Sequence, residues 1–256
     1  MNDLSALLTE EPDGLIEEIS PNDGMFVGNR IHYFAVAQGA LECIRVALLA
    51  AGKQDVRSIL DLPCGHGRVL RKLKAAFPDA ALTACDIERD GVDFCARVFG
   101  ATPVYSVDDP ASVALDGPFD LIWCGSLFTH LDEGRWHDWL DRFHSLLADG
   151  GLLVFTSHGR HTAAAMRNPD LVLTPAGIPR EYGITDPDIE AVLESYDETG
   201  FGFASYPYDT YDRFGVSASS PSWVLSELGA RNLRVVSFVE RGWDSHQDVV
   251  ACVREE

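Results

Sequence analysis

Two patterns of apolar residues alternate along the chain. Between residues 34 and 51, apolar positions recur every four residues, which predicts a helix that ends at Gly52. From residue 58 onward, short unbroken apolar runs alternate with stretches of helical period, striped by Val69, Val92 and Trp136. The runs predict five strands, at residues 58–62, 81–85, 102–107, 119–124 and 152–156.

Strands that alternate with helices of this length predict an α/β fold with a parallel sheet built from right-handed crossovers. Unbroken apolar runs indicate strands covered on both faces. After residue 157 the pattern loosens into a segment rich in Gly, Pro, Tyr and Asp, with one predicted helix at 187–196. A helix at 222–228 then leads into two strands, at 233–240 and 248–253, which residues 241–247 join as a hairpin.

The composition argues against several partner classes. A chain of 256 residues fits one large α/β domain, and its formal net charge is −20. Proteins that bind nucleic acid neutralise phosphates with clustered Lys and Arg, so a nucleic-acid partner is not expected. The basic residues of one local cluster are expected to form a solvated helix face. They are Arg68, Arg71, Lys72 and Lys74.

The sequence predicts a cytoplasmic protein with neither a membrane segment nor a metal site. The most apolar stretch is interrupted by Gln38, Glu42 and Arg45, and no basic region precedes an apolar one near the N-terminus. The cysteines lie mostly inside apolar runs without zinc-ligand spacing, which is typical of reduced, buried thiols. They are Cys43, Cys64, Cys85, Cys95, Cys124 and Cys252.

The strongest chemical signal follows the first predicted strand. Residues 60–70 have the sequence Leu-Asp-Leu-Pro-Cys-Gly-His-Gly-Arg-Val-Leu. Gly65 and Gly67 allow a ligand to approach the backbone, and the start of the next helix offers unpaired N–H groups. Asp86 closes the second strand, 19 residues after Gly67, where it can accept hydrogen bonds from ribose hydroxyls.

Two nucleotide cofactors fit such a turn, a dinucleotide and S-adenosylmethionine. The dinucleotide fingerprint has a third glycine where this chain has Leu70. Asp61 stands before the glycines, where a carboxylate can meet the ammonium of a methionine moiety but would gain nothing from a pyrophosphate. S-adenosylmethionine is therefore the expected cofactor.

These residues resemble the class I S-adenosylmethionine-dependent methyltransferases, of a bacterial small-molecule type. The resemblance covers nearly the whole chain and includes residues 119–131 and 150–155, which are similar to the fourth- and fifth-strand segments of that family. One departure is Pro63, which stands where the motif usually has its first glycine. The resemblance implies a Rossmann-like, doubly wound sheet of seven mostly parallel strands with an antiparallel last strand, an N-terminal helical cap and an insert after the fifth strand.

We expect a single methyltransferase domain over residues 1–256. Its expected parts are an N-terminal cap (1–54), a cofactor-binding core (55–157), an irregular insert (158–222) and a C-terminal helix and hairpin that complete the sheet (223–256). Aromatic residues in the insert form either a lid over the acceptor or a satellite core. They are Tyr206, Tyr208, Tyr211, Phe214 and Trp223.

The resemblance also implies which residues bind the cofactor. The glycine turn would hold the methionine end, the ends of the second and third strands would contact ribose and adenine, the end of the fourth strand would line the cofactor, and an N-terminal tyrosine would lie over it. The residues of the glycine turn are Asp61, Cys64, Gly65 and Gly67, and those at the ends of the second and third strands are Asp86, Ile87 and Asp108. Gly125 and Ser126 follow the fourth strand, and the N-terminal tyrosine is Tyr33.

Acceptor chemistry points to histidine. A sulfonium methyl group is already activated, so the enzyme mainly aligns a nucleophile, and a hydroxyl nucleophile also needs a base with a pKa near neutrality. The family topology brings His130, His158 and His246 to the ligand-binding edge of the sheet, and all three remain candidate bases.

The sequence thus predicts methyl transfer from S-adenosylmethionine to an oxygen, nitrogen or carbon of a small-molecule acceptor, with no nucleic-acid or membrane partner. Two alternatives remain. One is a non-catalytic cofactor-binding or assembly protein with the same fold. The other is a nicotinamide-dependent oxidoreductase, which Leu70 and Asp61 disfavour. The acceptor and the oligomeric state are left open.

Overall fold

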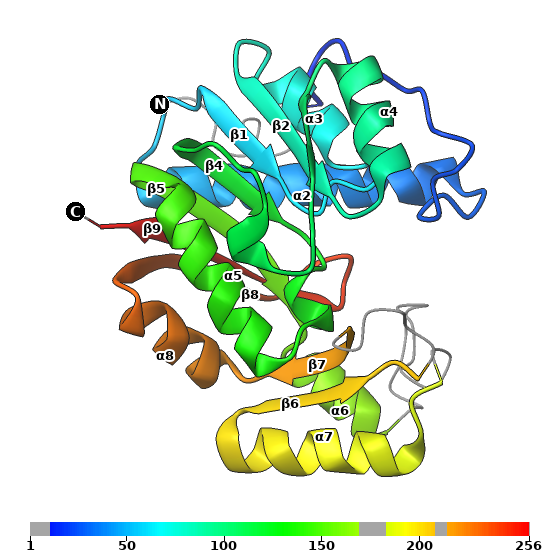
Figure 1. Ribbon diagram of the computed structural model, residues 1–256, viewed down its shortest axis with the longest axis vertical. Helices are drawn as coiled ribbons and strands as arrows, with labels where there is room; N and C mark the ends of the chain where they lie inside the picture. Colours follow the sequence, from blue (N-terminus) through cyan, green and yellow to red (C-terminus); the bar gives the residue numbers. More distant parts are fainter. Residues whose placement is uncertain (1–10, 169–182, 208–213, 256) are drawn as a thin grey trace.

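A seven-stranded sheet runs through the protein in the order β3-β2-β1-β4-β5-β9-β8 (Figure 1). The computed structural model describes residues 11–168, 183–207 and 214–255. β1 to β5 pair in parallel, whereas β9 is antiparallel to both of its neighbours. The predicted sheet is therefore confirmed. Its strands are β1 (Ser58–Asp61), β2 (Ala81–Asp86), β3 (Thr102–Tyr105), β4 (Phe119–Cys124), β5 (Leu147–Ser157), β8 (Leu233–Trp243) and β9 (Gln247–Arg254).

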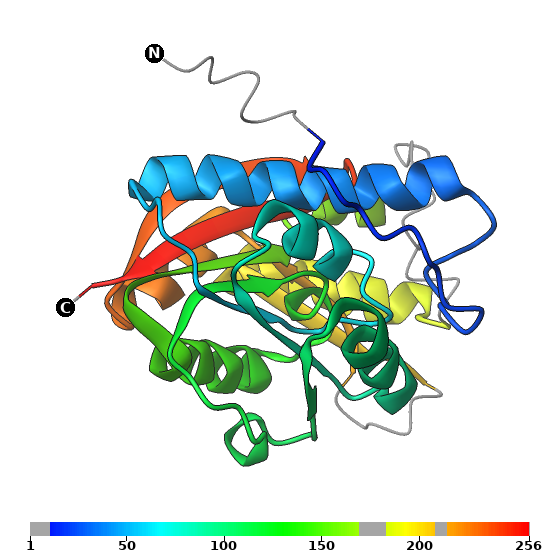
Figure 2. The same cartoon turned by 90° about the horizontal axis from the view of Figure 1, so that it is seen from above.

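Helices cover both faces of this sheet, which explains the unbroken apolar runs. Alternate strand residues enter two separate cores, as Ile59 and Leu60 do. The first core lies under α2 (Arg30–Ala51), α3 (Leu70–Ala76) and α4 (Arg89–Phe99). The second lies under α5 (Glu133–Leu146) and α8 (Pro221–Ala230), on the opposite face (Figures 1 and 2). Both sides of each central strand are thus removed from water.

The strand order reverses between β1 and β4, since β2 and β3 lie on one side of β1 while β4 and β5 extend the sheet on the other. Ligands of doubly wound folds bind at such a switch point, beyond the carboxyl ends of the strands. The turn between β8 and β9 reaches the same edge, because β9 runs antiparallel. The fold alone therefore predicts that a ligand site lies at the edge of the sheet where the parallel strands have their carboxyl ends.

Helix α2 is longer than predicted. It begins at Arg30, because the Asn29 side chain accepts a hydrogen bond from the backbone N–H of His32, and it ends at Gly52 in the left-handed region. By length and composition α2 could cross a membrane. In this fold one face of α2, which includes Ile44, is buried in the first core, whereas Ile31, Val46 and Leu49 are exposed.

The helix predicted at 187–196 is present as α7 (Asp186–Thr199), whereas the prediction that the rest of the insert is irregular is wrong for the part that the structure describes. α6 (Arg160–Arg167) follows β5, and α7 packs against an antiparallel pair, β6 (Phe201–Ser205) and β7 (Gly215–Ser219). These elements share a small satellite core of their own. Their short, Gly-rich strands lack the long apolar runs that identified the main sheet.

The aromatic residues predicted in the insert separate into different environments. Trp223 packs in the second core, with its ring centroid 4.7 Å from that of Phe201. Tyr206 and Phe214 face the cavity described below. Tyr208 and Tyr211 lie outside the described residues.

The expectation of a solvated basic helix face is also wrong. Arg71 and Lys72 are 0% and 1% exposed. The N-terminal segment, residues 11–29, runs across α3 and α4 and covers them (Figure 2). The Arg71 guanidinium donates hydrogen bonds to the carbonyl oxygens of Ile16 and Glu18, 3.0 and 2.9 Å away.

Candidate cofactor and acceptor site

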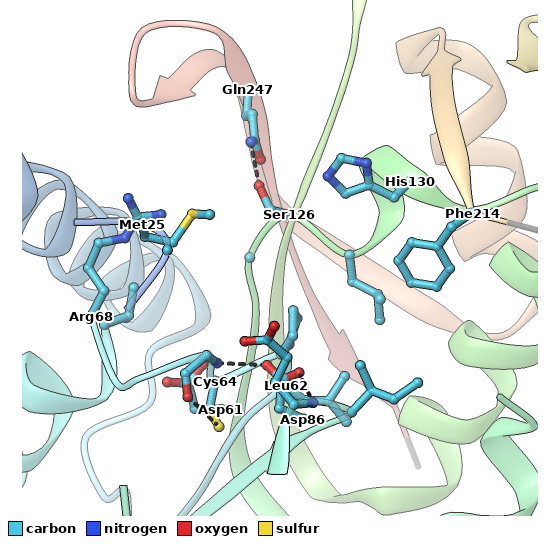
Figure 3. A pocket seen from close by; sticks show the side chains of 18 of the residues that line it. Met25, Asp61, Leu62, Cys64, Arg68, Asp86, Ser126, His130, Phe214 and Gln247 are labelled. Carbon is cyan, nitrogen blue, oxygen red and sulfur yellow. Dashed lines mark hydrogen bonds between the residues drawn. The ribbon is translucent and has the colours of Figure 1, made fainter. Parts of the chain in front are cut away.

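A cavity of about 640 Å³ opens at the predicted edge of the sheet (Figure 3). Its walls come from the N-terminal segment, from the carboxyl ends of β1, β2 and β4, from α6 and the β6–β7 hairpin, and from the turn between β8 and β9. Every residue that the sequence predicted for the site lines this cavity, with the exception of Gly67 and Tyr33.

The turn after β1 is built around its two glycines. Gly65 and Gly67 have φ angles of 48° and 76°, which favour glycine. A Cβ atom on Gly67 would lie 2.4 Å from the Phe99 ring, so a side chain there would force α4 away. The N–H of Cys64 donates to the carbonyl of Cys85, 3.0 Å away, which ties the turn to β2. Pro63 is accommodated within the same turn.

Asp86 connects this turn to the cavity. Its Oδ2 accepts a hydrogen bond from the Gly65 N–H at 2.7 Å, and its Oδ1 accepts one from the Glu88 N–H at 3.0 Å. Burial raises the pKa of the Asp86 carboxyl, and these two hydrogen bonds oppose the shift. Asp86 therefore holds the glycine turn in addition to facing the position predicted for ribose.

Replacing Asp86 with Ala is expected to weaken the binding of S-adenosylhomocysteine by about 10- to 100-fold, because the ligand loses a charged hydrogen-bond acceptor and the turn loses its support. Calorimetric titration measures this. Asp79→Ala, which removes an exposed acid just before β2, is the matched control and should bind normally. Equal affinities in the two variants would contradict a ligand-binding role for Asp86.

Asp61 is a buried carboxylate without a partner. It is 1% exposed, and neither of its oxygens has a hydrogen-bond partner among the described residues. Burial and the nearby Asp86 raise the pKa of Asp61 well above its ordinary value. An unpaired buried carboxylate is costly to a protein, so such a group at a cavity wall suits a cationic ligand. The ammonium of S-adenosylmethionine meets this requirement.

Arg68 lies at the same end of the cavity, although no role at this site was predicted for it. Its guanidinium packs over the Trp243 ring at 5.6 Å, and it lies beside Met25 in Figure 3. Burial lowers the pKa of Arg68, while the acids Asp23, Asp61 and Asp244 counteract that shift. A carboxylate and a guanidinium at one end of a cavity suit a ligand that carries both an ammonium and a carboxylate. The position of Arg68 one residue after Gly67 was the available signal.

The remaining predicted cofactor residues frame the opposite end and the centre of the cavity. Asp108 forms an ion pair with Arg135, a buried residue of α5 that the sequence did not indicate. Gly125 contacts the Trp123 ring so closely that a Cβ would lie 3.0 Å from it. Ser126 follows with a φ of 60°, in the left-handed region that non-glycine residues seldom adopt.

All three predicted histidines line the cavity. His130 Nδ1 lies 3.0 Å from both the Tyr206 hydroxyl and the Gly215 carbonyl. The ring centroids of His158 and His246 are 6.1 Å apart. Burial, with smaller effects of His130 and His246, lowers the pKa of His158 to about 3. His158 is therefore uncharged at neutral pH.

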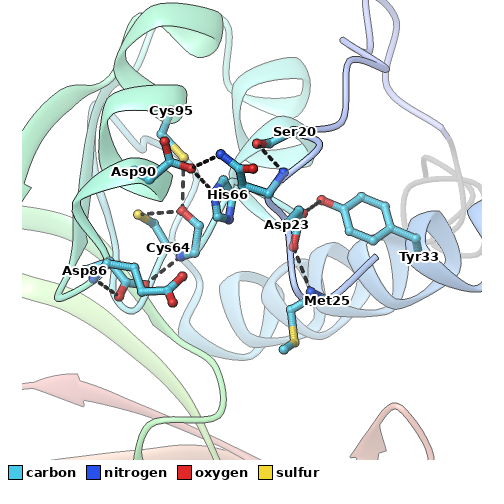
Figure 4. A network of polar contacts seen from close by, with 12 residues as sticks. Ser20, Asp23, Met25, Tyr33, Cys64, His66, Asp86, Asp90 and Cys95 are labelled. Atoms are coloured by element: carbon cyan, nitrogen blue, oxygen red, sulfur yellow. Dashed lines mark hydrogen bonds and ion pairs between the residues drawn. The ribbon is translucent and has the colours of Figure 1, made fainter. Parts of the chain in front are cut away.

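Tyr33 does not occupy its expected place over the cofactor. It is 1% exposed and lies behind the cavity wall, where its hydroxyl donates a 2.6 Å hydrogen bond to Asp23 and accepts one from Arg71 at 3.2 Å (Figure 4). Asp23 and Met25 line the cavity in its stead. Tyr33 was misplaced because the sequence does not show that residues 20–29 turn back over the glycine turn.

A second contact fastens the N-terminal segment to the glycine turn. Asp90 Oδ2 accepts a hydrogen bond from the Asn22 side chain at 3.0 Å and lies 2.9 Å from His66 Nε2 (Figure 4). His66 belongs to the turn and Asn22 to the segment, and both line the cavity. The described residues contain no cluster of His, Cys, Asp or Glu that could hold a metal ion.

Comparison with known proteins agrees with this geometry. Residues 60–153, which include the glycine turn and Asp86, match the family model described as a methyltransferase domain. Over these residues the chain is similar to methyltransferase domains, and its whole sheet has the fold of an S-adenosylmethionine-dependent methyltransferase. The buried carboxylate Asp61 and the glycine turn both lie within the matched residues.

Individual relatives resemble this chain over different lengths. A malonyl-[acyl-carrier protein] O-methyltransferase of Geobacter sulfurreducens is 32% identical over 137 residues, which are 51% of this chain and 49% of that protein. The chain spans about half the length of the curated relatives it matches. An S-adenosylmethionine-dependent methyltransferase from Clostridium acetobutylicum shares the fold, with a TM-score of 0.57 and 13% identity over 91% of this chain and 96% of that one.

Proposed function

We propose that this protein transfers the methyl group of S-adenosylmethionine to a small-molecule acceptor. The observation that carries the proposal is Asp61, a buried carboxylate with no hydrogen-bond partner among the described residues, at the wall of the cavity. Asp61 and Arg68 would hold the ammonium and carboxylate of the methionine end. Asp86 and Ile87 would contact the ribose and adenine, and Asp108 would lie beyond them.

In the proposed reaction the bond between the methyl carbon and the sulfonium sulfur breaks as a bond forms from that carbon to the acceptor. S-adenosylhomocysteine leaves with the electron pair of the broken bond, and an acceptor hydroxyl gives up its proton to a base. The histidines at the cavity supply that base. Because burial lowers the pKa of His158 to about 3, His158 is a poor match for a base that must act near neutral pH.

The acceptor would bind where the insert meets the sheet. His130, Phe214 and Met166 line this side of the cavity, and the His130 and Phe214 rings lie nearly parallel, at 14°. The curated relatives named above are O-methyltransferases, so we propose an oxygen acceptor as the first to test. We further propose a cytoplasmic location and no nucleic-acid or membrane partner, in keeping with a net charge of −20.

Saturating S-adenosylhomocysteine is expected to raise the Tm of the protein, because a ligand that binds only the native state stabilises it, by about 2.7 kcal/mol at 100 times its Kd. NAD and NADP should leave the Tm unchanged. Differential scanning fluorimetry measures all three. A shift with a dinucleotide alone would favour the oxidoreductase alternative. Binding without any release of labelled methyl to a metabolite extract would favour the non-catalytic one.

A further inference from the structure

Gln247, the first residue of β9, joins three strand ends at the cavity wall. Its side-chain carbonyl accepts a hydrogen bond from the Thr156 hydroxyl at 2.5 Å, and its side-chain nitrogen donates to Ser126 Oγ at 2.6 Å (Figure 3). The Ser126 N–H donates in turn to Thr156 Oγ1 at 2.8 Å. Ser126 follows β4 and Thr156 belongs to β5, so the three residues close a ring of hydrogen bonds across β4, β5 and β9.

The direction of these hydrogen bonds is determined by Thr156. Its side chain is 0% exposed, and its oxygen already accepts the Ser126 N–H. The one hydroxyl proton of Thr156 therefore needs an acceptor, and the Gln247 carbonyl supplies it. A reversed amide would leave that buried proton without an acceptor, which is unfavourable. The NH₂ group of Gln247 accordingly faces Ser126.

The contacts of His246 agree with this orientation of the Gln247 side-chain amide. Its Nδ1 lies 2.7 Å from the carbonyl oxygen of Asp244. A carbonyl only accepts, so Nδ1 carries the proton and Nε2 of the neutral ring has a lone pair. That Nε2 lies 3.3 Å from the Gln247 side-chain nitrogen. The second amide proton of Gln247 therefore has an acceptor as well.

The proton of the Ser126 hydroxyl is the one member of this network with no acceptor among the described residues. Its oxygen accepts from Gln247, so its proton is directed away from the amide and towards the cavity that Ser126 lines. Ser126 is held with a φ of 60°, and backbone strain of this kind is found where a side chain must take one position. In Figure 3 Ser126 lies between the cofactor end, marked by Asp61, and the acceptor side, marked by His130.

We propose that Gln247 is a positioning residue that fixes the Ser126 hydroxyl as a hydrogen-bond donor to the methyl acceptor. The acceptor is then a molecule with an oxygen or nitrogen lone pair beside the atom that receives the methyl group. This inference rests on the proposed function. His246 serves to orient Gln247, since its Nε2 lone pair is engaged there, which leaves His130 as the candidate to take the proton of the acceptor.

Gln247→Glu tests the proposal with almost no change of shape. A carboxylate at position 247 accepts hydrogen bonds from both the Thr156 and the Ser126 hydroxyls, so the Ser126 proton turns towards residue 247 and away from the cavity. His246 can then donate to this carboxylate only if Nε2 carries a proton. In ¹⁵N NMR at neutral pH, with S-adenosylhomocysteine bound, we expect His246 of the unchanged protein to carry its proton on Nδ1 and none on Nε2. We expect a proton on Nε2 in Gln247→Glu. A proton on Nε2 in the unchanged protein, or no change in the variant, overturns the proposal.

Methyl transfer gives a second readout, with labelled S-adenosylmethionine and a panel of alcohols, phenols and carboxylic acids. Gln247→Glu and Ser126→Ala are expected to lower kcat/KM for an accepted compound by about tenfold or more, the loss expected for one hydrogen bond. Their Kd for S-adenosylhomocysteine should be unchanged. Gln54→Glu, the same change at an exposed site before β1, is the matched control.

The outcomes separate this inference from the proposed function. A weaker Kd for S-adenosylhomocysteine in Ser126→Ala would place Ser126 on the cofactor, as the resemblance implied, and would overturn the inference alone. Failure of the unchanged protein to bind S-adenosylhomocysteine would overturn the proposed function. Full activity of Gln247→Glu would remove Gln247 from any positioning role.

Discussion

Asp61→Asn is expected to weaken the binding of S-adenosylhomocysteine by about 100-fold while raising the Tm of the ligand-free protein. The affinity falls because the ligand ammonium loses its buried counter-charge, a change of about 3 kcal/mol. The Tm rises because the unliganded protein no longer buries an unpaired carboxylate, which is 1% exposed and has no hydrogen-bond partner among the described residues. Calorimetry and thermal melts measure the two effects.

The same substitution should change how binding and stability depend on pH. Burial and Asp86 raise the pKa of Asp61, so the folded protein holds this proton more tightly than the unfolded chain. Ligand-free stability is therefore lost as pH rises from the ordinary carboxyl pKa to the raised one. Affinity for the ligand follows the opposite course and increases as Asp61 ionises. Both trends should be absent in Asp61→Asn.

Asp55→Asn is the control for these measurements, since the Asp55 side chain is 86% exposed and precedes the same strand. It should leave the affinity, the Tm and both pH profiles unchanged. The opposite pair of results in Asp61→Asn, unchanged affinity with a lower Tm, would show that Asp61 supports the fold and does not meet the cofactor.

Arg71→Met is expected to lower the free energy of unfolding by about 3–5 kcal/mol. The substitution keeps the apolar part of the side chain but removes a guanidinium that is 0% exposed. It leaves the part-buried carbonyl oxygens of Ile16 and Glu18 and the Tyr33 hydroxyl without the guanidinium donor, and each unsatisfied group costs about 1–3 kcal/mol before relaxation. Denaturant unfolding monitored by circular dichroism measures the loss.

Arg71→Met should also weaken cofactor binding, because the guanidinium holds the N-terminal segment that brings Asp23 and Met25 to the cavity. Arg71→Lys retains the charge but reaches fewer of these acceptors, so an intermediate loss of stability is expected. Lys74→Met, on the same helix and only half-buried, is the control and should stay within about 0.5 kcal/mol of the unchanged protein. An equal effect of the Arg71 and Lys74 substitutions would contradict the role given to Arg71.

Prediction from the sequence succeeded where the signal is local. The unbroken apolar runs identified five strands, and the glycine turn with Asp61 and Asp86 indicated the edge of the sheet at which the cavity opens. A strand buried on both faces, or a turn that requires positive φ, limits the residues at its own positions. Such features are visible in consecutive residues.

Prediction failed where distant segments meet. Arg71 contacts Ile16, which is 55 residues away in the sequence. A helix face exposed to solvent and a helix face covered by a distant loop can have the same local sequence, so the burial of Arg71 was not visible in it. Tyr33 was assigned to the cofactor for the same reason, although Asp23 stands between its hydroxyl and the cavity. The strands of the insert, β6 and β7, were missed because short strands rely on packing more than on their own pattern.

The sequence by itself determined the class of fold, the edge of the sheet where the cavity opens and the carboxylates Asp61 and Asp86 that line it. These follow from periodicity and from the backbone conformations that glycine permits. Only the tertiary structure decided which side chains share the cavity and in which direction their hydrogen bonds run. Ser126 and Gln247 are 121 residues apart, and their contact exists because β9 enters the sheet antiparallel beside β5. Pairings between strand ends depend on the register of the whole sheet, which no short stretch of sequence contains.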